Sequence, residues 1–122
     1  MPQQNLSEEQ KKILSEQRAW MVATASKEGK PNIAAKGSKQ ILDDATLGFG
    51  EIFGGITYSN LMENPVVTIF AFDPAGPAQI RCVGDAEICT SGAIYDAVAE
   101  KLQSKGHPKP KAFIKVKLTE IR

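Results

Sequence analysis

The sequence has 122 residues, of which 42% are hydrophobic and 24% are charged, and its formal net charge at pH 7 is +1. This length and composition are typical of a single soluble globular domain, and no apolar run approaches the roughly 18 residues of a membrane helix. The small net charge provides no general attraction for nucleic acid, so neither nucleic acid nor a membrane is an expected partner. The polar N-terminus lacks the apolar core of a secretion signal, so we expect a cytoplasmic protein.

The N-terminal part of the sequence predicts a short helix and then a strand hairpin. Ser7 and Gln10 fit the capping-box pattern, which predicts a helix over about residues 8–17. Residues 20–26 are apolar and β-branched, and a glycine-containing turn separates them from residues 31–37. This arrangement predicts an antiparallel hairpin.

Glycines alternate along the third predicted strand, "ATLGFGE", in residues 45–51. Gly48 and Gly50 share one face of this strand, while Leu47 and Phe49 share the other. Glycine at alternate positions leaves a flat strip of backbone that another backbone or a planar ligand can approach closely. We therefore expect this strip to be open to a ligand.

The segment "GEIFGGIT" follows, and it predicts the start of a second helix. Gly55 or Thr57 can cap this helix, which should end near Asn64 because a proline comes next. The segment matches the phosphate-loop pattern G-x-x-x-x-G-K-[ST] except that Ile56 replaces the lysine. The parallel scaffold of a nucleotide loop is not predicted, so two interpretations remain. The segment is either an ordinary glycine-rich turn or an anion site built from the free amides of a helix start.

The second half of the chain predicts three strands and one helix. Strands are joined in runs by short turns rather than alternating regularly with helices, which indicates an antiparallel sheet. The predicted fold is mainly β, a small antiparallel six-stranded split β-barrel with peripheral short helices. We expect one domain over residues 1–122, with the N-terminal helix in 1–18 and the barrel in 19–122. The later strands are predicted at 66–73, 78–90 (bent at Gly84) and 112–121, and the third helix at 92–105.

Other residues that could carry chemistry have simpler interpretations. Cys82 and Cys89 have no other zinc ligands at a suitable spacing, so both are expected to be reduced thiols. His107 lies in a polar loop without an orienting partner, so no catalytic side chain and no metal site are predicted. Trp20 could pack in the core or cover a ligand. The lysines between residues 105 and 117 form either a solvated face or a basic patch.

Three motifs, "ATASKEGKP", "DDATLGFG" and "TYSNLMENP", resemble in order and spacing those of the pyridoxamine 5′-phosphate oxidase-like, FMN-binding split-barrel family. The resemblance extends from about Trp20 to the end of the chain. It implies a homodimer with FMN in grooves between the subunits. It also implies a flavoprotein that transfers electrons or hydride between an unknown donor and an unknown acceptor.

The resemblance also implies which residues hold FMN. The phosphate would be held by the second strand and the second helix start, and the isoalloxazine ring would lie along the third strand, residues 47–51. The matching cofactor-binding residues are Lys36, Gly37, Ser38, Lys39, Phe49, Gly50, Glu51, Gly55, Thr57 and Asn60.

Two features of the sequence favour other outcomes within this fold. Many family members place Lys or Arg where this chain has Ile56, and the lost charge motivates an alternative. In this alternative the protein binds another anionic ligand, haem or a deazaflavin, without flavin chemistry. A dimer with an empty groove is a third possibility. The chain also lacks the longer C-terminal segment that helps the true oxidase hold its substrate, so pyridoxamine-phosphate oxidation itself is not expected.

Overall fold

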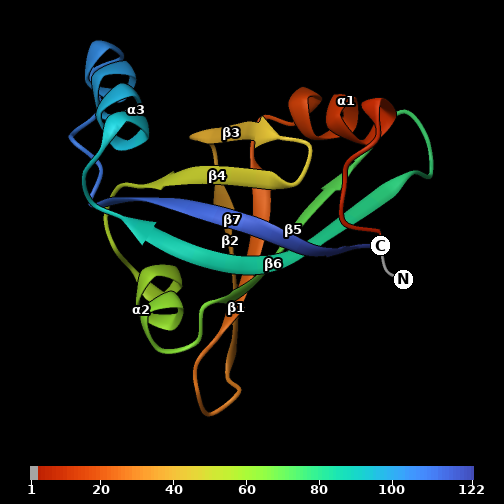
Figure 1. Cartoon of the computed structure of the whole chain (residues 1–122), viewed down its shortest axis with the longest axis horizontal. Coiled ribbons are helices and arrows are strands. Elements are labelled where there is room, and N and C mark those ends of the chain that lie inside the picture. The colour runs from red at the N-terminus through yellow and green to blue at the C-terminus, as the bar shows by residue number, and fades with distance from the viewer. Residues whose placement is uncertain (1–2) are drawn as a thin grey trace.

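A computed structural model describes residues 3–122 and contains one antiparallel sheet of seven strands with three helices around it (Figure 1). The strand order across the sheet is β2-β1-β5-β6-β7-β4-β3. The helices are α1 (Glu8–Glu16), α2 (Ile56–Glu63) and α3 (Ala93–Ser104). The strands are β1 (Trp20–Ala25), β2 (Pro31–Lys36), β3 (Lys39–Asp43), β4 (Thr46–Glu51), β5 (Val66–Phe72), β6 (Gln79–Cys89) and β7 (Ala112–Ile121).

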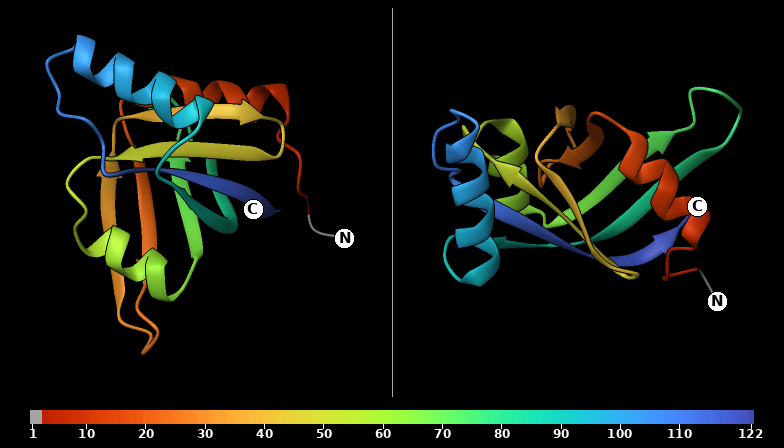
Figure 2. Two further views of the ribbon diagram at one scale, coloured as in Figure 1. Left: turned by 60° about the vertical axis from the view of Figure 1, so that its left-hand side comes forward. Right: turned by 90° about the horizontal axis from the view of Figure 1, so that it is seen from above.

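The sheet coils so that its two halves cross, with β2, β1 and β5 behind β7, β4 and β3 (Figures 1 and 2). The long strand β6 pairs with β5 and with β7 and so joins the halves. The edge strands β2 and β3 are neighbours in the chain, but no backbone ladder joins them within residues 3–122. The result is a barrel that stays open along one seam, which confirms the predicted split-barrel fold.

The predicted count of six strands was wrong, because residues 39–43 form a strand of their own. The chain turns sharply at Gly37 and Ser38, where the amide of Lys39 donates to the carbonyl of Gly37 at 3.1 Å. This turn separates β2, which pairs with β1, from β3, which pairs with β4. The pattern of apolar residues gave no sign of this change of partner.

Local signals in the sequence are otherwise well matched by the structure. The Ser7 hydroxyl accepts from the Gln10 amide at 3.1 Å, and the Gln10 side chain accepts from the Ser7 amide at 3.0 Å, so the capping box is present. The β6–β7 register shifts at Gly84. A Cβ atom on Gly84 would lie 2.4 Å from the carbonyl oxygen of Lys117, which explains the glycine at this bulge.

The main core lies between the two crossing halves of the sheet. Its largest side chains include Trp20 and Phe49, both essentially fully buried. The Trp20 indole donates to the carbonyl of Leu14 at 2.9 Å, which fastens the start of β1 to α1. Trp20 is therefore a core residue with a satisfied donor, which answers the question that the sequence left open.

A second, smaller core lies outside the sheet, beneath α3. Tyr95, Val98 and Leu102 of this helix pack on the fully buried ring of Phe113 in β7. The Tyr95 hydroxyl donates to the carbonyl of Pro110 at 2.7 Å, which ties the helix to the segment before β7. Through these contacts α3 covers the outer face of the sheet at one end. No helix within residues 3–122 is both long and apolar enough to cross a membrane.

Cys82 offers a direct test of the core packing. This thiol lies on β6 in the main core, and burial raises its pKa to about 12. At pH 8 the reactive thiolate is then roughly one part in ten thousand. We expect the native protein to react with a thiol reagent at the half-buried Cys89 at most, and slowly there because burial also raises its pKa. Absorbance titration with a disulfide reagent should count the second thiol only after denaturation, and two fast-reacting thiols in the native protein would contradict this core.

Candidate functional site

A small recess, which we call the split hollow, opens at the seam where the end of β2 approaches the end of β4. Its volume is about 180 Å³. A larger recess, which we call the α3 cleft, lies beside it between α3 and β3 and measures about 590 Å³. The split hollow is lined by Ala35, Lys36, Gly37, Ser38, Gly50, Glu51, Ile52 and Phe53. The structure thus brings together five of the residues predicted to bind the cofactor: Lys36, Gly37, Ser38, Gly50 and Glu51.

An ion pair crosses the seam at the split hollow. The Lys36 ammonium lies 2.8 Å from the Glu51 carboxylate, and their side chains are 16% and 4% exposed. Beside it, the Gly50 amide donates to the carbonyl of Ser38 at 2.7 Å. The ion pair joins the two halves of the sheet where no strand ladder does, while the Gly50–Ser38 bond continues the pairing of β3 with β4. Because Glu51 neutralises Lys36, the split hollow carries no net charge of its own.

The glycine strip on β4 is not open to a ligand as predicted. A Cβ atom on Gly48 would lie 2.2 Å from Cζ of Phe113, so the Phe113 ring occupies the space that the glycine leaves. A Cβ atom on Gly50 would lie 2.9 Å from the hydroxyl oxygen of Ser38. The bare backbone therefore accommodates side chains of the chain itself. Phe49, on the opposite face, is a core residue and lines neither recess.

The start of α2 differs in detail from the predicted anion site. Gly55 is the N-cap and supplies no side-chain acceptor, and Ile56 is 63% exposed. Thr57 is not the cap, since it lies inside the first turn and is only 3% exposed. The Asn60 amide donates to the Thr24 hydroxyl at 3.0 Å, which fastens α2 to β1. None of Gly55, Thr57 and Asn60 lines either recess.

Lys111 brings a positive charge to this helix start, whereas the sequence pointed to it only as one lysine of a possible basic patch. Gly54 has φ +67°, and a Cβ atom there would lie 2.5 Å from Cδ of Lys111. The Lys111 ammonium lies 4.8 Å from the centre of the Tyr58 ring, in a cation–π contact. The Lys111 amide also donates to the carbonyl of Glu51 at 2.7 Å. The Lys111 ammonium therefore lies beside the start of α2, where Ile56 itself carries no charge.

Lys39, the other lysine predicted to bind the cofactor, lines the α3 cleft. Its lining is Arg18, Gly37, Ser38, Lys39, Gln40, Ile52, Val98, Lys101, Leu102, Lys105 and His107. Partial burial, and then the nearby charge of Lys101, lower the pKa of Lys39 from its ordinary value. Lys36 and Lys39 were predicted to act on one phosphate, but the turn at Gly37 places them in different recesses.

Comparison with known proteins agrees with the fold. The family model described as pyridoxamine 5′-phosphate oxidase matches residues 6–122. An uncharacterized protein of Methanocaldococcus jannaschii, MJ0282, is 35% identical over 121 residues, which cover 95% of this chain and 78% of that protein. The crystal structure of HupZ from Group A Streptococcus is 33% identical, with a TM-score of 0.86 over 95% of this chain and 91% of that one.

A third similar structure shows the fold alone. It is an FMN-binding protein from Syntrophomonas wolfei, 19% identical, with a TM-score of 0.76 over 90% of this chain and 79% of that one. The family match covers nearly the whole chain and includes every element that forms the split hollow. The chain belongs to the pyridoxamine 5′-phosphate oxidase family.

Proposed function

We propose that this protein binds FMN at the split hollow and transfers electrons or hydride between partners that the site does not identify. The observation that carries the proposal is the recess at the seam, formed by the end of β2 and by residues 50–53. The family resemblance assigns FMN to these same segments. The FMN-binding relative from Syntrophomonas wolfei shares the fold and so supports the assignment.

The size of the split hollow favours a site completed by a second copy of the chain. Its volume of about 180 Å³ is smaller than the roughly 300–1,000 Å³ of typical ligand pockets. Phe53, at its rim, is 85% exposed. Ile33 on β2 and Ile56 and Met62 on α2 are also exposed. Exposed apolar side chains of this kind mark association surfaces, so we propose a homodimer that covers this face and closes the groove.

The helix start that follows the split hollow in the chain fits a flavin phosphate better than Ile56 alone suggests. The amides of the first turn of α2 have no side-chain cap, and Lys111 lies beside them. Such amides and a neighbouring ammonium both favour an anion. Lys36, which Glu51 holds in place, would orient the ligand at the seam rather than supply net charge. Bound FMN would supply the redox chemistry, while the chain binds it, orients it and excludes water.

Purified protein titrated with FMN tests the proposal. We expect a flavin absorption band that survives desalting, quenched flavin fluorescence at micromolar protein, and a dimer by light scattering. FMN at about 100 times its dissociation constant should add about 2.7 kcal/mol of stability. If haem or a deazaflavin raised the melting temperature while FMN did not, that ligand and not FMN would be the one that the protein binds. A monomer that binds FMN fully would contradict the proposed second copy.

Lys111→Met should weaken FMN binding by about tenfold to a hundredfold, the loss expected for one charge-assisted hydrogen bond. The matched control is Lys109→Met, which removes the same charge from the same loop. Lys109 contacts the Tyr95 ring under α3 and lies away from the start of α2. Fluorescence titration of both variants gives the comparison. Equal affinities for the two variants would show that the phosphate does not lie beside α2.

A further inference from the structure

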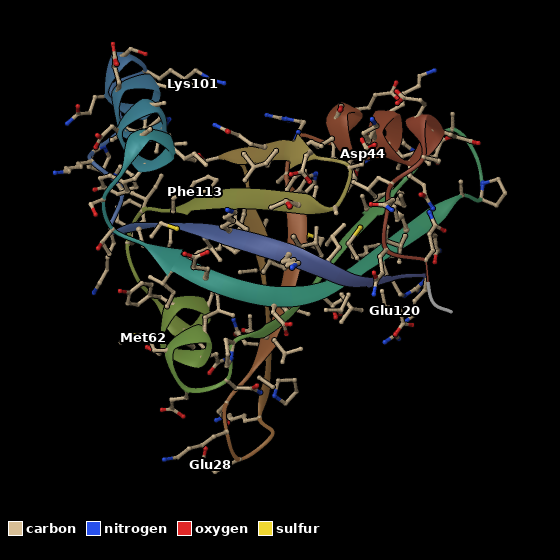
Figure 3. The ribbon with its side chains drawn as sticks, viewed as in Figure 1. Glu28, Asp44, Met62, Lys101, Phe113 and Glu120 are labelled. Atoms are coloured by element: carbon tan, nitrogen blue, oxygen red, sulfur yellow. The ribbon has the colours of Figure 1, made fainter. Side chains whose placement is uncertain are left out.

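The α3 cleft is a second recess with a different chemical character from the split hollow. It lies where α3 stands over the edge strand β3, at the upper edge of the sheet (Figures 1 and 2). Lys101 projects from α3 on this side of the molecule, far from Glu28 at the tip of the β1–β2 hairpin (Figure 3). The cleft and the split hollow share Gly37, Ser38 and Ile52, so they adjoin each other.

The charged side chains of the α3 cleft are all basic. Arg18, Lys39, Lys101 and Lys105 line it together with His107, and no Asp or Glu does. In the part of the chain that the structure describes, none of these cations lies within 4.0 Å of a carboxylate. Three segments far apart in the sequence therefore place positive charges in one recess, and no carboxylate of the described residues pairs with them.

Lys39 shows that placing these positive charges close together has an energetic cost. Its ammonium lies 5.6 Å from the centre of the Trp20 ring and donates to the carbonyl of Ser15 at 3.4 Å. Partial desolvation, followed by the like charge of Lys101, lowers its pKa. A bound anion would raise this pKa again, because opposite charge favours the protonated ammonium.

The shape of the cleft defines the class of ligand. Its volume of about 590 Å³ lies within the range of small-molecule pockets, roughly 300–1,000 Å³. Ile52, Val98 and Leu102 add apolar lining beside the cations. Lys39 is partly buried, whereas Arg18, Lys101 and Lys105 are exposed. The overall charge of +1 and the limited size of the cleft favour a small molecule over nucleic acid, which binds extended basic surfaces.

We propose that the α3 cleft is a second binding site, for a small molecule that joins several negative charges, as phosphate or carboxylate groups, to an apolar or aromatic body. The site goes beyond flavin binding and does not depend on it. If FMN occupies the split hollow, the shared wall at Gly37 and Ser38 would place the anionic ligand next to the flavin. The ligand would then be a substrate or an effector of the flavin site.

Calorimetric titration of the flavin-free protein with pyrophosphate, citrate, inorganic phosphate and 1-naphthyl phosphate tests the proposal at low salt. Pyrophosphate and citrate separate phosphate from carboxylate as the preferred group, and the naphthyl ester, compared with inorganic phosphate, tests the apolar lining. The charge variant is Lys101→Met with Lys105→Met. Its matched control is Lys27→Met with Lys30→Met, which removes the same charge from the exposed tip of the β1–β2 hairpin.

We expect the charge variant to lose about tenfold or more in affinity for the preferred anion, while the control stays close to wild type. 1-Naphthyl phosphate should bind more tightly than inorganic phosphate, and amide NMR shifts should move at β3 and α3. Equal losses in both variants would show that only general charge attracts the anion and would overturn the site. Stronger binding of a single-stranded oligonucleotide than of any small anion would also overturn it. FMN binding measured separately on the same variants keeps the two proposals distinct.

Discussion

Gly48→Ala is expected to lower the free energy of unfolding by about 3 kcal/mol, as overpacking of a rigid core does. The new methyl group would lie 2.2 Å from Cζ of Phe113 and 3.2 Å from the carbonyl oxygen of Ile114. The Phe113 ring is fully buried beneath α3, so the ring has no free volume into which it could move away from the new methyl group. Urea denaturation followed by circular dichroism measures the loss.

A double-mutant cycle separates this cause from a general preference for glycine in the strand. Phe113→Leu alone should destabilise the protein, because the smaller side chain leaves part of the space under α3 unfilled. Combined with Gly48→Ala, it should cost less than the sum of the two single changes, since the methyl group then enters that space. Gly76→Ala, in the exposed β5–β6 loop, is the control and should change stability little. Strictly additive losses at positions 48 and 113 would rule out the proposed contact.

Glu51→Leu should be the other strongly destabilising change, costing about 3 kcal/mol. It would leave the Lys36 ammonium at the seam without its carboxylate, and that side chain is only 16% exposed. The effect would arise from an uncompensated charge rather than from lost packing, because leucine keeps most of the volume. Denaturant midpoints at constant salt give the measurement.

The double variant Lys36→Met with Glu51→Leu should return to within about 1 kcal/mol of wild type, because two apolar side chains can replace a buried ion pair. The control Lys11→Met removes a partly exposed cation that pairs with the exposed carboxylates of Glu8 and Asp44, and it should cost less than about 1 kcal/mol. If the double variant were less stable than Glu51→Leu alone, the ion pair would not be the cause of the loss.

Most of the fold could be predicted because its signals are local. The capping box at Ser7, the alternation of apolar residues in β7 and the glycine bulge at Gly84 each depend on residues close in sequence. The division between β2 and β3 was not predicted, since a strand was expected over residues 31–37 and none over residues 39–43. The change of partner depends on how the sheet coils, which no single segment encodes.

The candidate site was predictable in its segments and not in its contacts. The resemblance pointed to the end of β2 and the end of β4, and the structure places both at the split hollow. The glycine strip was misjudged because its occupant, Phe113, lies more than sixty residues further along the chain. Lys111 and the Lys36–Glu51 pair were missed for the same reason, since strand alternation gives the face of a residue but not its partner across a seam.

The seam also bears on how easily such a protein changes its ligand. Lys36 and Glu51 bridge the open seam through an ion pair, where a closed barrel would use a row of backbone hydrogen bonds. Substitutions there can widen, narrow or recharge the recess while every strand keeps its neighbours. The same two side chains therefore affect both the recess and the stability of the barrel, so the ligand site can be changed at little cost to folding only when Lys36 and Glu51 are replaced together.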